Sequence, residues 1–419
     1  MKKLTAILLA VALCLALVAC GTSTTQAPAA TQAPAAAPEQ AAEAAPEAAE
    51  APAAQSGPVA GLICLHDENS GYDANFINGF VAACEALGVE YSIKKNIDDT
   101  NTEGYDAACE LADDGCKVVF SDSYGHGSYL LQAAQEIPEV HFTSCTADNA
   151  QSAGLDNFHN AFAQIHNGRY LAGVAAGMKL AEMIANGECE ADCKVGYVAA
   201  MPYAEVISGY TSWFLGLRSV EGCENVTMDV TYTGTWLDED LENTAAGKLI
   251  DGGCVLISQH ADSMGAPNAC EHHEPNPIPN VSYNGSTMAA CPNSYIISSR
   301  IDWEPYFTYA IQAVLNGEGY DTDYIGTLET GSVKLTELNE NVAAPGTAEK
   351  LAEVEAGLLD GTIHPFATEN WTVNGEHLDT YDQAAFYEGN ECIWDGYFHE
   401  SETRSAPYFD LIIDGINVL

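Results

Sequence analysis

The sequence predicts an α/β protein with two similarly built lobes, each a parallel β-sheet covered by helices on both faces. Short apolar runs rich in β-formers alternate with amphipathic helical stretches from residue 59 onward, and the series starts again near residue 169. The stretches 110–121 and 248–258 also resemble each other, since each has a helix end, a Gly, a Cys and an apolar strand. Such alternation requires right-handed crossovers between parallel strands.

The N-terminus predicts export and a lipid anchor. Lys2 and Lys3 precede an apolar run, 4–17, that is too short to span a bilayer comfortably. The run LVAC at 17–20 resembles the lipobox of bacterial lipoprotein precursors. We therefore expect residues 1–19 to be a signal peptide and Cys20 to be lipidated, which holds the chain on the extracytoplasmic face of the cell membrane. An ordinary secretory signal and a transmembrane helix are the alternatives.

The next stretch has the composition of a spacer. Residues 21–57 are almost wholly Ala, Pro, Glu, Gln, Thr and Ser, without an aromatic or large aliphatic residue. No core can form there, so 20–57 is predicted to be a semi-extended tether. The remainder, from residue 58, is long enough for two lobes with separate cores.

The predicted elements follow in chain order. In the first series, strands are expected at 61–65, 90–93, 117–121 and 141–144, and helices at 75–87, 105–112 and 129–135. In the second series, helices are expected at 169–184, 205–219 and 241–250, and strands at 194–199, 227–232 and 254–258. Further helices are expected at 306–316 and 347–359. The part from about residue 331 should pack on the second lobe, and its pattern leaves open whether it reaches a binding site.

The charge excludes several partners. The chain has 60 acidic and 14 basic residues, a formal charge of −46. This argues against electrostatic binding of nucleic acid, of an anionic membrane surface or of a ligand with several phosphates. The acidity itself is typical of a solvating surface.

The cysteines leave two interpretations open. Twelve follow Cys20, and two pairs, Cys109 with Cys116 and Cys189 with Cys193, are close enough in sequence for local disulfides. The other interpretation is that they are small buried thiols.

Ligands of parallel α/β sheets bind beyond the carboxyl ends of the strands. In the first half, the segments after strands are 66–73 and 122–127. In the second half they are 200–203, 233–238 and 259–263. They hold aromatic rings beside amide and carboxylate groups, which suits a flat, neutral, hydrogen-bonding ligand.

Several motifs occur in one order and spacing over residues 57–419. They are 137–142 (IPEVHF), 169–177 (RYLAGVAAG), 196–198 (GYV), 202–207 (PYAEVI), 216–218 (GLR), 235–238 (TWLD), 259–263 (QHADS) and 302–303 (DW) with Tyr306. Together they resemble the basic membrane protein (BMP) family, the lipoprotein solute receptors of ABC importers. That family includes purine nucleoside receptors.

The resemblance implies a type I periplasmic-binding-protein fold, with two Rossmann-like lobes and a hinge of three crossovers. The first lobe would comprise 58–157 and 286–318, and the second 158–285 and 319–419. It implies a receptor and not an enzyme, with no cofactor and no metal. The ligand would be a purine nucleobase or nucleoside, which the receptor would pass to the permease and ATPase subunits of an ABC importer.

The resemblance also implies which side chains bind the ligand. In the first lobe these are Asn69, Ser70, Tyr72, Asp73, Tyr124, Gly125 and His126. The remaining candidates are Tyr203, Trp213, Trp236, Asp238, Gln259, Asp262, Asn284 and Trp303. Residues 69–73 read NSGYD where many members have DKSFN, and Cys145 stands where many have Asp. An Asp for ribose is therefore not evident, which makes a bare, adenine-like base plausible.

Three alternatives compete with this hypothesis. The same fold can bind a sugar or a signalling molecule. An enzyme is a weaker alternative, because 125–128 (GHGS) matches neither the G-x-G-x-x-G nor the G-x-S-x-G spacing. A metal site at 270–274 (CEHHE) is also weak, because adjacent residues cannot all converge on one ion.

Overall fold

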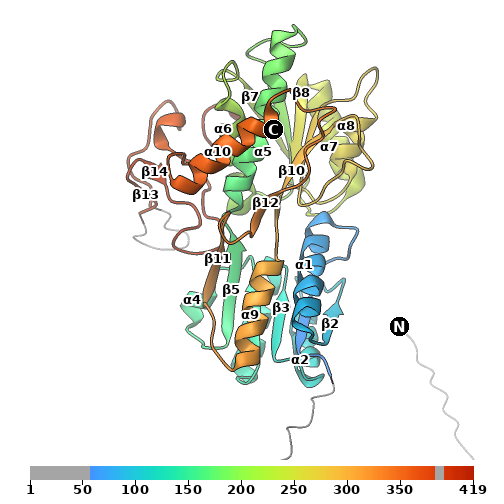
Figure 1. Cartoon of the computed structure of the whole chain (residues 1–419), viewed down its shortest axis with the longest axis vertical. Coiled ribbons are helices and arrows are strands. Elements are labelled where there is room, and N and C mark those ends of the chain that lie inside the picture. The colour runs from blue at the N-terminus through green and yellow to red at the C-terminus, as the bar shows by residue number, and fades with distance from the viewer. Residues whose placement is uncertain (1–56, 383–390) are drawn as a thin grey trace, which may run out of the picture. The chain divides into compact units, whose positions relative to one another are not determined.

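The computed structural model describes residues 57–382 and 391–419. The predicted signal peptide, lipidated Cys20 and most of the tether lie outside these residues. These described residues form one compact unit that contains two large sheets and a small two-stranded one (Figure 1). Among the described helices, none has the length and apolar composition needed to cross a membrane.

The first sheet is parallel throughout and has the order β11-β5-β4-β3-β1-β2. Its strands are β1 (Ala60–Ile63), β2 (Tyr91–Lys94), β3 (Val118–Ser121), β4 (His141–Cys145), β5 (Phe158–Ala163) and β11 (Asp323–Gly326). Its helices are α1 (Gly71–Leu87), α2 (Glu103–Asp113), the short η1 (Tyr124–His126), α3 (Gly127–Glu136), α4 (Ala150–Ala153) and α9 (Glu304–Asn316). One core cluster joins α1 and α9 to one face, and another joins α2 and α3 to the other. Alternate strand residues supply both, as the period of a strand requires.

The second sheet has the order β12-β10-β9-β8-β6-β7-β15 and is parallel except between β10 and β12. Its strands are β6 (Lys194–Ala199), β7 (Thr227–Tyr232), β8 (Cys254–Gln259), β9 (Asn280–Tyr283), β10 (Tyr295–Ile301), β12 (Val333–Leu335) and β15 (Ile416–Val418). Helices α5 (Ile165–Ala185), α6 (Ala204–Arg218) and α10 (Thr347–Asp360) pack in the larger core cluster on one side. Helices α7 (Glu239–Asp251) and α8 (Gly265–Glu271) cover the other.

Three crossovers join the sheets, as the predicted fold requires. They lie between β5 and α5, between β10 and α9, and between β11 and β12. The lobe limits differ from the predicted ones, because β5 and β11 belong to the first sheet and β10 to the second. The strand β5, FHNAFA, is fully buried although its sequence contains polar residues. Its Asn160 is satisfied inside the protein by the N–H of Ala150 at 2.6 Å and the carbonyl of Ser144 at 3.0 Å.

The C-terminal part packs on the second lobe, as expected, and also contacts the first. It contains η2 (Thr368–Asn370) and the small hairpin of β13 (Ile393–Trp394) and β14 (Tyr397–Phe398). Phe398 and Phe409 are buried in the large core of the second lobe. Beyond β14, the backbone N–H of Ser405 donates to the carboxylate of Asp323 on β11, at 3.1 and 3.2 Å.

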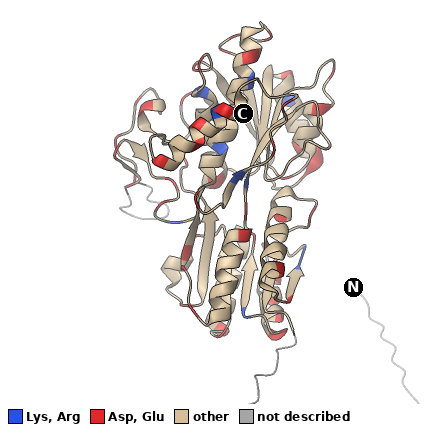
Figure 2. Cartoon of the chain, in the orientation of Figure 1, with Lys and Arg blue, Asp and Glu red and all other residues tan. Residues whose placement is uncertain are grey.

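The distribution of charged residues and the state of the cysteines can now be compared with the sequence. Figure 2 shows Asp and Glu spread over the helices and loops of both lobes, with few Lys and Arg. The twelve cysteines after Cys20 are all free thiols in the structure, the pairs Cys109 with Cys116 and Cys189 with Cys193 included. Most of them are buried, which agrees with the interpretation as small core residues.

Helices α5 and α6 approach so closely that their backbones touch. A Cβ atom on Gly173 would lie 2.0 Å from the carbonyl oxygen of Trp213, and one on Gly216 would lie 2.1 Å from that of Tyr170. Backbone atoms cannot move aside as the end of a long side chain can. Glycine at these positions therefore sets the distance between the two helices on which the core of the second lobe rests.

We expect Gly216→Ala to lower the free energy of unfolding by about 1–3 kcal/mol, because the methyl group overpacks this contact. Urea denaturation of the purified protein measures the change. Gly247→Ala on α7 is the matched control, since no atom lies within 4 Å of its added Cβ. It should raise stability by up to about 1 kcal/mol, through helix propensity. Equal stability of the Gly216 variant and the wild type would contradict the close contact.

Candidate functional site

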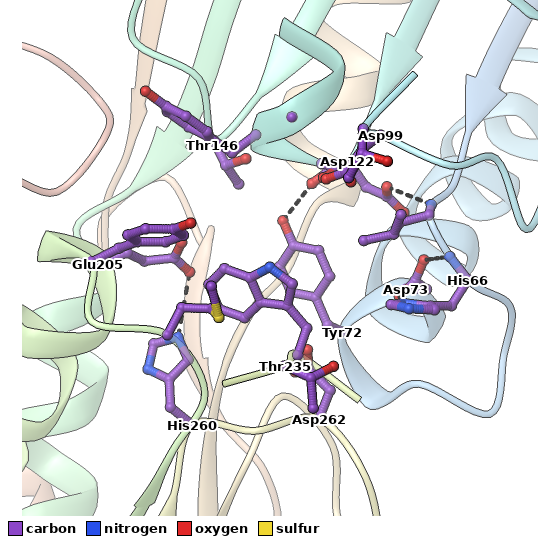
Figure 3. A pocket seen from close by; sticks show the side chains of 18 of the residues that line it. His66, Tyr72, Asp73, Asp99, Asp122, Thr146, Glu205, Thr235, His260 and Asp262 are labelled. Carbon is purple, nitrogen blue, oxygen red and sulfur yellow. Dashed lines mark hydrogen bonds and ion pairs between the residues drawn. The ribbon is translucent and has the colours of Figure 1, made fainter. Parts of the chain in front are cut away.

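A cavity of about 390 Å³ lies between the carboxyl ends of the two sheets. Loops after β1, β2, β3 and β4 form its wall in the first lobe, and loops after β6, β7 and β8, with Tyr283 at the end of β9, form the wall in the second. Its volume lies within the range of about 300–1,000 Å³ that is typical of small-molecule sites. Figure 3 shows side chains from both walls pointing into this space.

Seven of the residues predicted to bind ligand line this cavity. They are Tyr72, Asp73, Tyr124, Gly125, Tyr203, Trp236 and Asp262. Both lobes contribute to the set, and each residue lies directly after a strand or at the start of the following helix. The other eight predicted residues do not line the cavity.

Trp213 and Trp303 are core residues that do not line this cavity. Trp213 is fully buried, with its ring 5.9 Å from that of Tyr197 in the core of the second lobe. Trp303 is 2% exposed, and its ring stacks on Phe76 at 4.0 Å in the core of the first lobe. The apolar surface of each indole is used to join a helix to its sheet.

Four more of the eight have structural contacts of their own. Ser70 caps α1 by accepting the N–H of Asp73 at 3.1 Å, and Asp238 caps α7 by accepting that of Leu241 at 2.9 Å. His126 is buried, and its ring nitrogens bond to Ser121 Oγ at 2.9 Å and to the carbonyl of Ile97 at 3.0 Å. Asn69 is exposed in its turn.

The last two lie behind the cavity wall. The amide nitrogen of Gln259 donates to the carbonyl oxygens of Ala261 and Ser263, at 2.8 and 3.2 Å, which shapes the loop after β8. The amide nitrogen of Asn284 donates to Oδ1 of Asp262 at 3.2 Å. Asn284 thus positions a carboxyl group that does line the cavity.

Aromatic rings reach the cavity from both lobes. The hydroxyl of Tyr72 donates to the carbonyl of Asp122 at 2.6 Å, which fixes the ring. Tyr124 and Tyr203 remain 52% and 49% exposed, although they are large side chains at the wall of a cavity. The rings of Tyr203 and Trp236 lie 6.0 Å apart at 50°. Flat apolar surface is therefore available on both sides of the space.

Five carboxyl groups line the same cavity, and its lining includes neither Lys nor Arg. They belong to Asp73, Asp99, Asp122, Glu205 and Asp262. The cavity thus repels anions and favours a neutral or cationic ligand that donates hydrogen bonds.

Asp122 and Asp73 differ in charge although they are neighbours. Burial, with the nearby Asp73 charge, raises the pKa of Asp122 well above its usual range. For Asp73, burial acts in the same direction, but hydrogen bonds from His66 and Ser70 outweigh it and lower the pKa. Asp122 is thus the protonated partner and Asp73 the ionised one. The proton of Asp122 lies toward Asp73, so the two carboxyl groups share it beside the cavity wall.

The same two carboxyl groups and Cys64 form a buried group of possible metal ligands, with one atom from each within 4.8 Å of the others. Burial, followed by the charges of Asp122 and Asp73, raises the pKa of the Cys64 thiol. Without a bound ion, a buried thiol of this kind stays protonated.

His260 is neutral, and its tautomer is defined by its neighbours. Nη2 of Arg169 donates to Nδ1 at 3.0 Å, so the proton of the ring lies on Nε2, 3.4 Å from Oε1 of Glu205. Burial and the charge of Arg169 lower the pKa of His260 to about 4. Glu205 is thereby held at the cavity by a neutral donor (Figure 3).

Several residues that line the cavity were not named as ligand-binding candidates, among them His66, Asp122, Glu205, His260 and Tyr283. His66, Asp122 and His260 lie in the predicted segments 66–73, 122–127 and 259–263, whereas Glu205 and Tyr283 lie outside all of the predicted segments. Each of the five lies at the end of a parallel strand or in the first turn of the next helix. Position after a strand end therefore predicts which residues line the cavity more reliably than aromatic character does.

The comparisons with known proteins agree with this geometry. The model of the Bmp family, described as "ABC transporter substrate-binding protein PnrA-like", matches residues 65–363. A purine-binding protein of Brucella abortus is 28% identical over 308 residues, which are 70% of this chain and 81% of that protein. A protein of Haloferax volcanii, provisionally named an ABC transporter glucose-binding protein, is 26% identical over 65% of each chain. The fold is similar to that of a solute-binding protein from Aeropyrum pernix, with a TM-score of 0.63 and 16% identity over 76% of this chain and 95% of the other.

The protonated state of Asp122 predicts a pH dependence of stability. Above about pH 4 the carboxyl group ionises in the unfolded chain but not in the folded protein. The folded state then binds more protons, so stability falls as the pH rises. Asn in place of Asp122 mimics the protonated acid and does not titrate. In the Asp122→Asn variant, the free energy of unfolding should therefore fall less steeply with pH, by up to about 1.4 kcal/mol per pH unit.

Urea denaturation at pH 4.5 and pH 8 measures this difference. The exposed Asp395→Asn is the control and should leave the pH dependence of the wild type unchanged. The same pH dependence in the Asp122 variant and the wild type would show that Asp122 is ionised in the folded protein.

Proposed function

The chain belongs to the Bmp family of PnrA-like ABC transporter substrate-binding proteins, and on that premise we propose that its ligand is a purine nucleobase or nucleoside. The ligand is held in the cavity between the lobes and is then delivered to the permease of an ABC importer. The observation that carries this proposal is the pairing of aromatic rings from both lobes with a wall of carboxyl groups.

The aromatic residues supply affinity for a flat ring. Stacking of a base on an aromatic side chain contributes about 1–3 kcal/mol per contact. Two such contacts provide about half of a micromolar affinity, which corresponds to about −8 kcal/mol. A ligand that touches rings of both lobes binds best when the lobes are close together, so binding favours the closed arrangement.

The carboxyl groups supply selectivity for the base edge. An amino-purine such as adenine has exocyclic N–H donors next to ring nitrogens that accept hydrogen bonds. The ionised Asp73 offers carboxylate oxygens to such a donor. A ligand that leaves one of these buried groups unpaired loses about 1–3 kcal/mol. The cavity therefore favours a neutral amino-purine over a nucleotide.

A sugar is the second candidate ligand. The Haloferax relative carries a glucose-binding name, and carboxylates beside aromatic rings also suit hydroxylated rings. The Brucella relative, which covers more of both chains, carries a purine-binding name and favours the first candidate.

The predicted lipid anchor completes the proposal. Acyl chains on Cys20 hold the receptor outside the membrane, and residues 21–57 let the lobes move near the permease. Tethering of this kind raises the effective concentration of the receptor at its transporter.

We expect Trp236→Ala to weaken adenine binding by about tenfold or more, because one stacking surface is lost. Isothermal titration calorimetry measures the affinity, and a thermal melt shows that the variant is folded. Trp394→Ala is a matched control, since this exposed indole on β13 does not line the cavity. An unchanged affinity of the Trp236 variant would remove this residue from the site.

Mass spectrometry of small molecules that copurify with the protein separates the two candidate ligands. We expect a purine to be released on denaturation and adenine to bind in calorimetry, whereas glucose gives no heat of binding. Released sugar, together with binding of glucose but not adenine, would replace the purine proposal.

A further inference from the structure

A second cavity, of about 380 Å³, adjoins the first at its aromatic end. The two cavities share the lining residues Tyr124, Thr146, Tyr203, Glu205 and Trp236. A ligand that contacts Trp236 in the first cavity can therefore extend a substituent into the second without leaving the site.

The far wall of the second cavity comes from the C-terminal part of the chain. We call residues 399–410 the C-terminal strap. Its Arg404, Ala406, Pro407 and Asp410 line the cavity. The match to the family model ends at residue 363, so this wall lies in a part of the chain that the model does not cover.

The C-terminal strap is fixed to the second lobe at both of its ends. On one side it continues from β14, whose Phe398 is buried in the core. On the other side, Glu400 accepts the backbone N–H groups of Tyr408 at 2.8 Å and Phe409 at 2.6 Å, and both rings are buried in the same core. The intervening loop is therefore held in a defined place beside the cavity.

The tip of the strap is fixed to the first lobe. Nη1 of Arg404 donates to Oδ2 of Asp148 at 3.2 Å, in the loop after β4. Nε of Arg404 also donates to the carbonyl of Ala406 at 3.2 Å, and Nη2 donates to that of Pro407 at 3.3 Å. Arg404 is 3% exposed. Its guanidinium thus closes the turn of the strap and joins it to the opposite lobe.

The chemistry of the second cavity indicates what it accepts. Asp148, Glu205 and Asp410 offer carboxylate oxygens, and Arg404 already pairs with Asp148. A phosphate group would meet these carboxylates and be repelled. A neutral group with several hydroxyls would donate to them, while Pro407 and Ala406 contact its carbon atoms.

We propose that the second cavity binds the pentose of a nucleoside whose base lies in the first cavity, and that the C-terminal strap makes the protein prefer nucleosides to free bases. This inference rests on the proposed purine function. It places the sugar against a wall that the family resemblance did not indicate.

Calorimetric titration with adenosine and with adenine tests the inference. In the wild type, adenosine should bind about tenfold or more tightly than adenine, because hydrogen bonds to carboxylates are added. Ala406→Phe fills the second cavity and should remove this preference, while the affinity for adenine stays within about twofold. Asp410→Asn keeps an acceptor for the hydroxyl of Tyr381, 2.6 Å away, and should reduce the preference by a smaller factor.

Asp395→Asn, an exposed change on the same C-terminal part, is the control and should leave both affinities unchanged. Thermal melts show whether each variant is folded. If Ala406→Phe does not fold, the Asp410→Asn variant provides the test. Equal changes in its affinities for adenosine and for adenine would overturn the inference. If wild-type protein binds adenine at least as tightly as adenosine, the inference is overturned, but the purine function is not. Wild-type protein that binds neither would contradict the purine function and this inference with it.

Discussion

The parallel direction of the strands is the constraint on which the rest of the structure depends. Because β1, β3 and β4 run the same way, their loops meet at one edge of the first sheet. The same is true of β6, β7 and β8 in the second sheet. Each helix must then return along a face of its sheet, which buries the apolar sides and leaves the loops at the strand ends to line the cavity between the sheets. The parallel direction of the strands thus determines both the arrangement of the helices and the place of the site.

That constraint explains how much of the molecule could be predicted. Strands with plain apolar runs, such as β3 and β6, were found within a residue or two. The helices α6, α7, α9 and α10 were predicted to a similar precision, whereas α1 and α5 begin four residues before their predicted starts. β5 was missed as part of the first sheet because its polar His159 and Asn160 are satisfied only by partners distant in the chain. Local pattern carries no information about such partners. The same limit applies to β10, whose neighbours in the sheet decide its lobe.

The candidate site was predictable by position but not by residue type. Tyr72 and Trp236 line the cavity, whereas Trp213 and Trp303 are equally aromatic and belong to the cores. An indole on a helix face and an indole on a loop look the same in sequence, and only packing separates them. The carboxyl group of Asp122 was missed for a related reason. Its importance comes from burial beside Asp73, and burial is a property of the folded protein.

The C-terminal strap also has a consequence for the rate at which the lobes separate. The chain passes between the lobes three times, and the contacts of Arg404 with Asp148 and of Ser405 with Asp323 form a fourth, noncovalent link. Any motion that separates the strap from the first lobe has to break these contacts first. Under the proposed function, the strap would therefore add to the barrier for ligand escape, and residues outside the first cavity would set part of the lifetime of the loaded receptor.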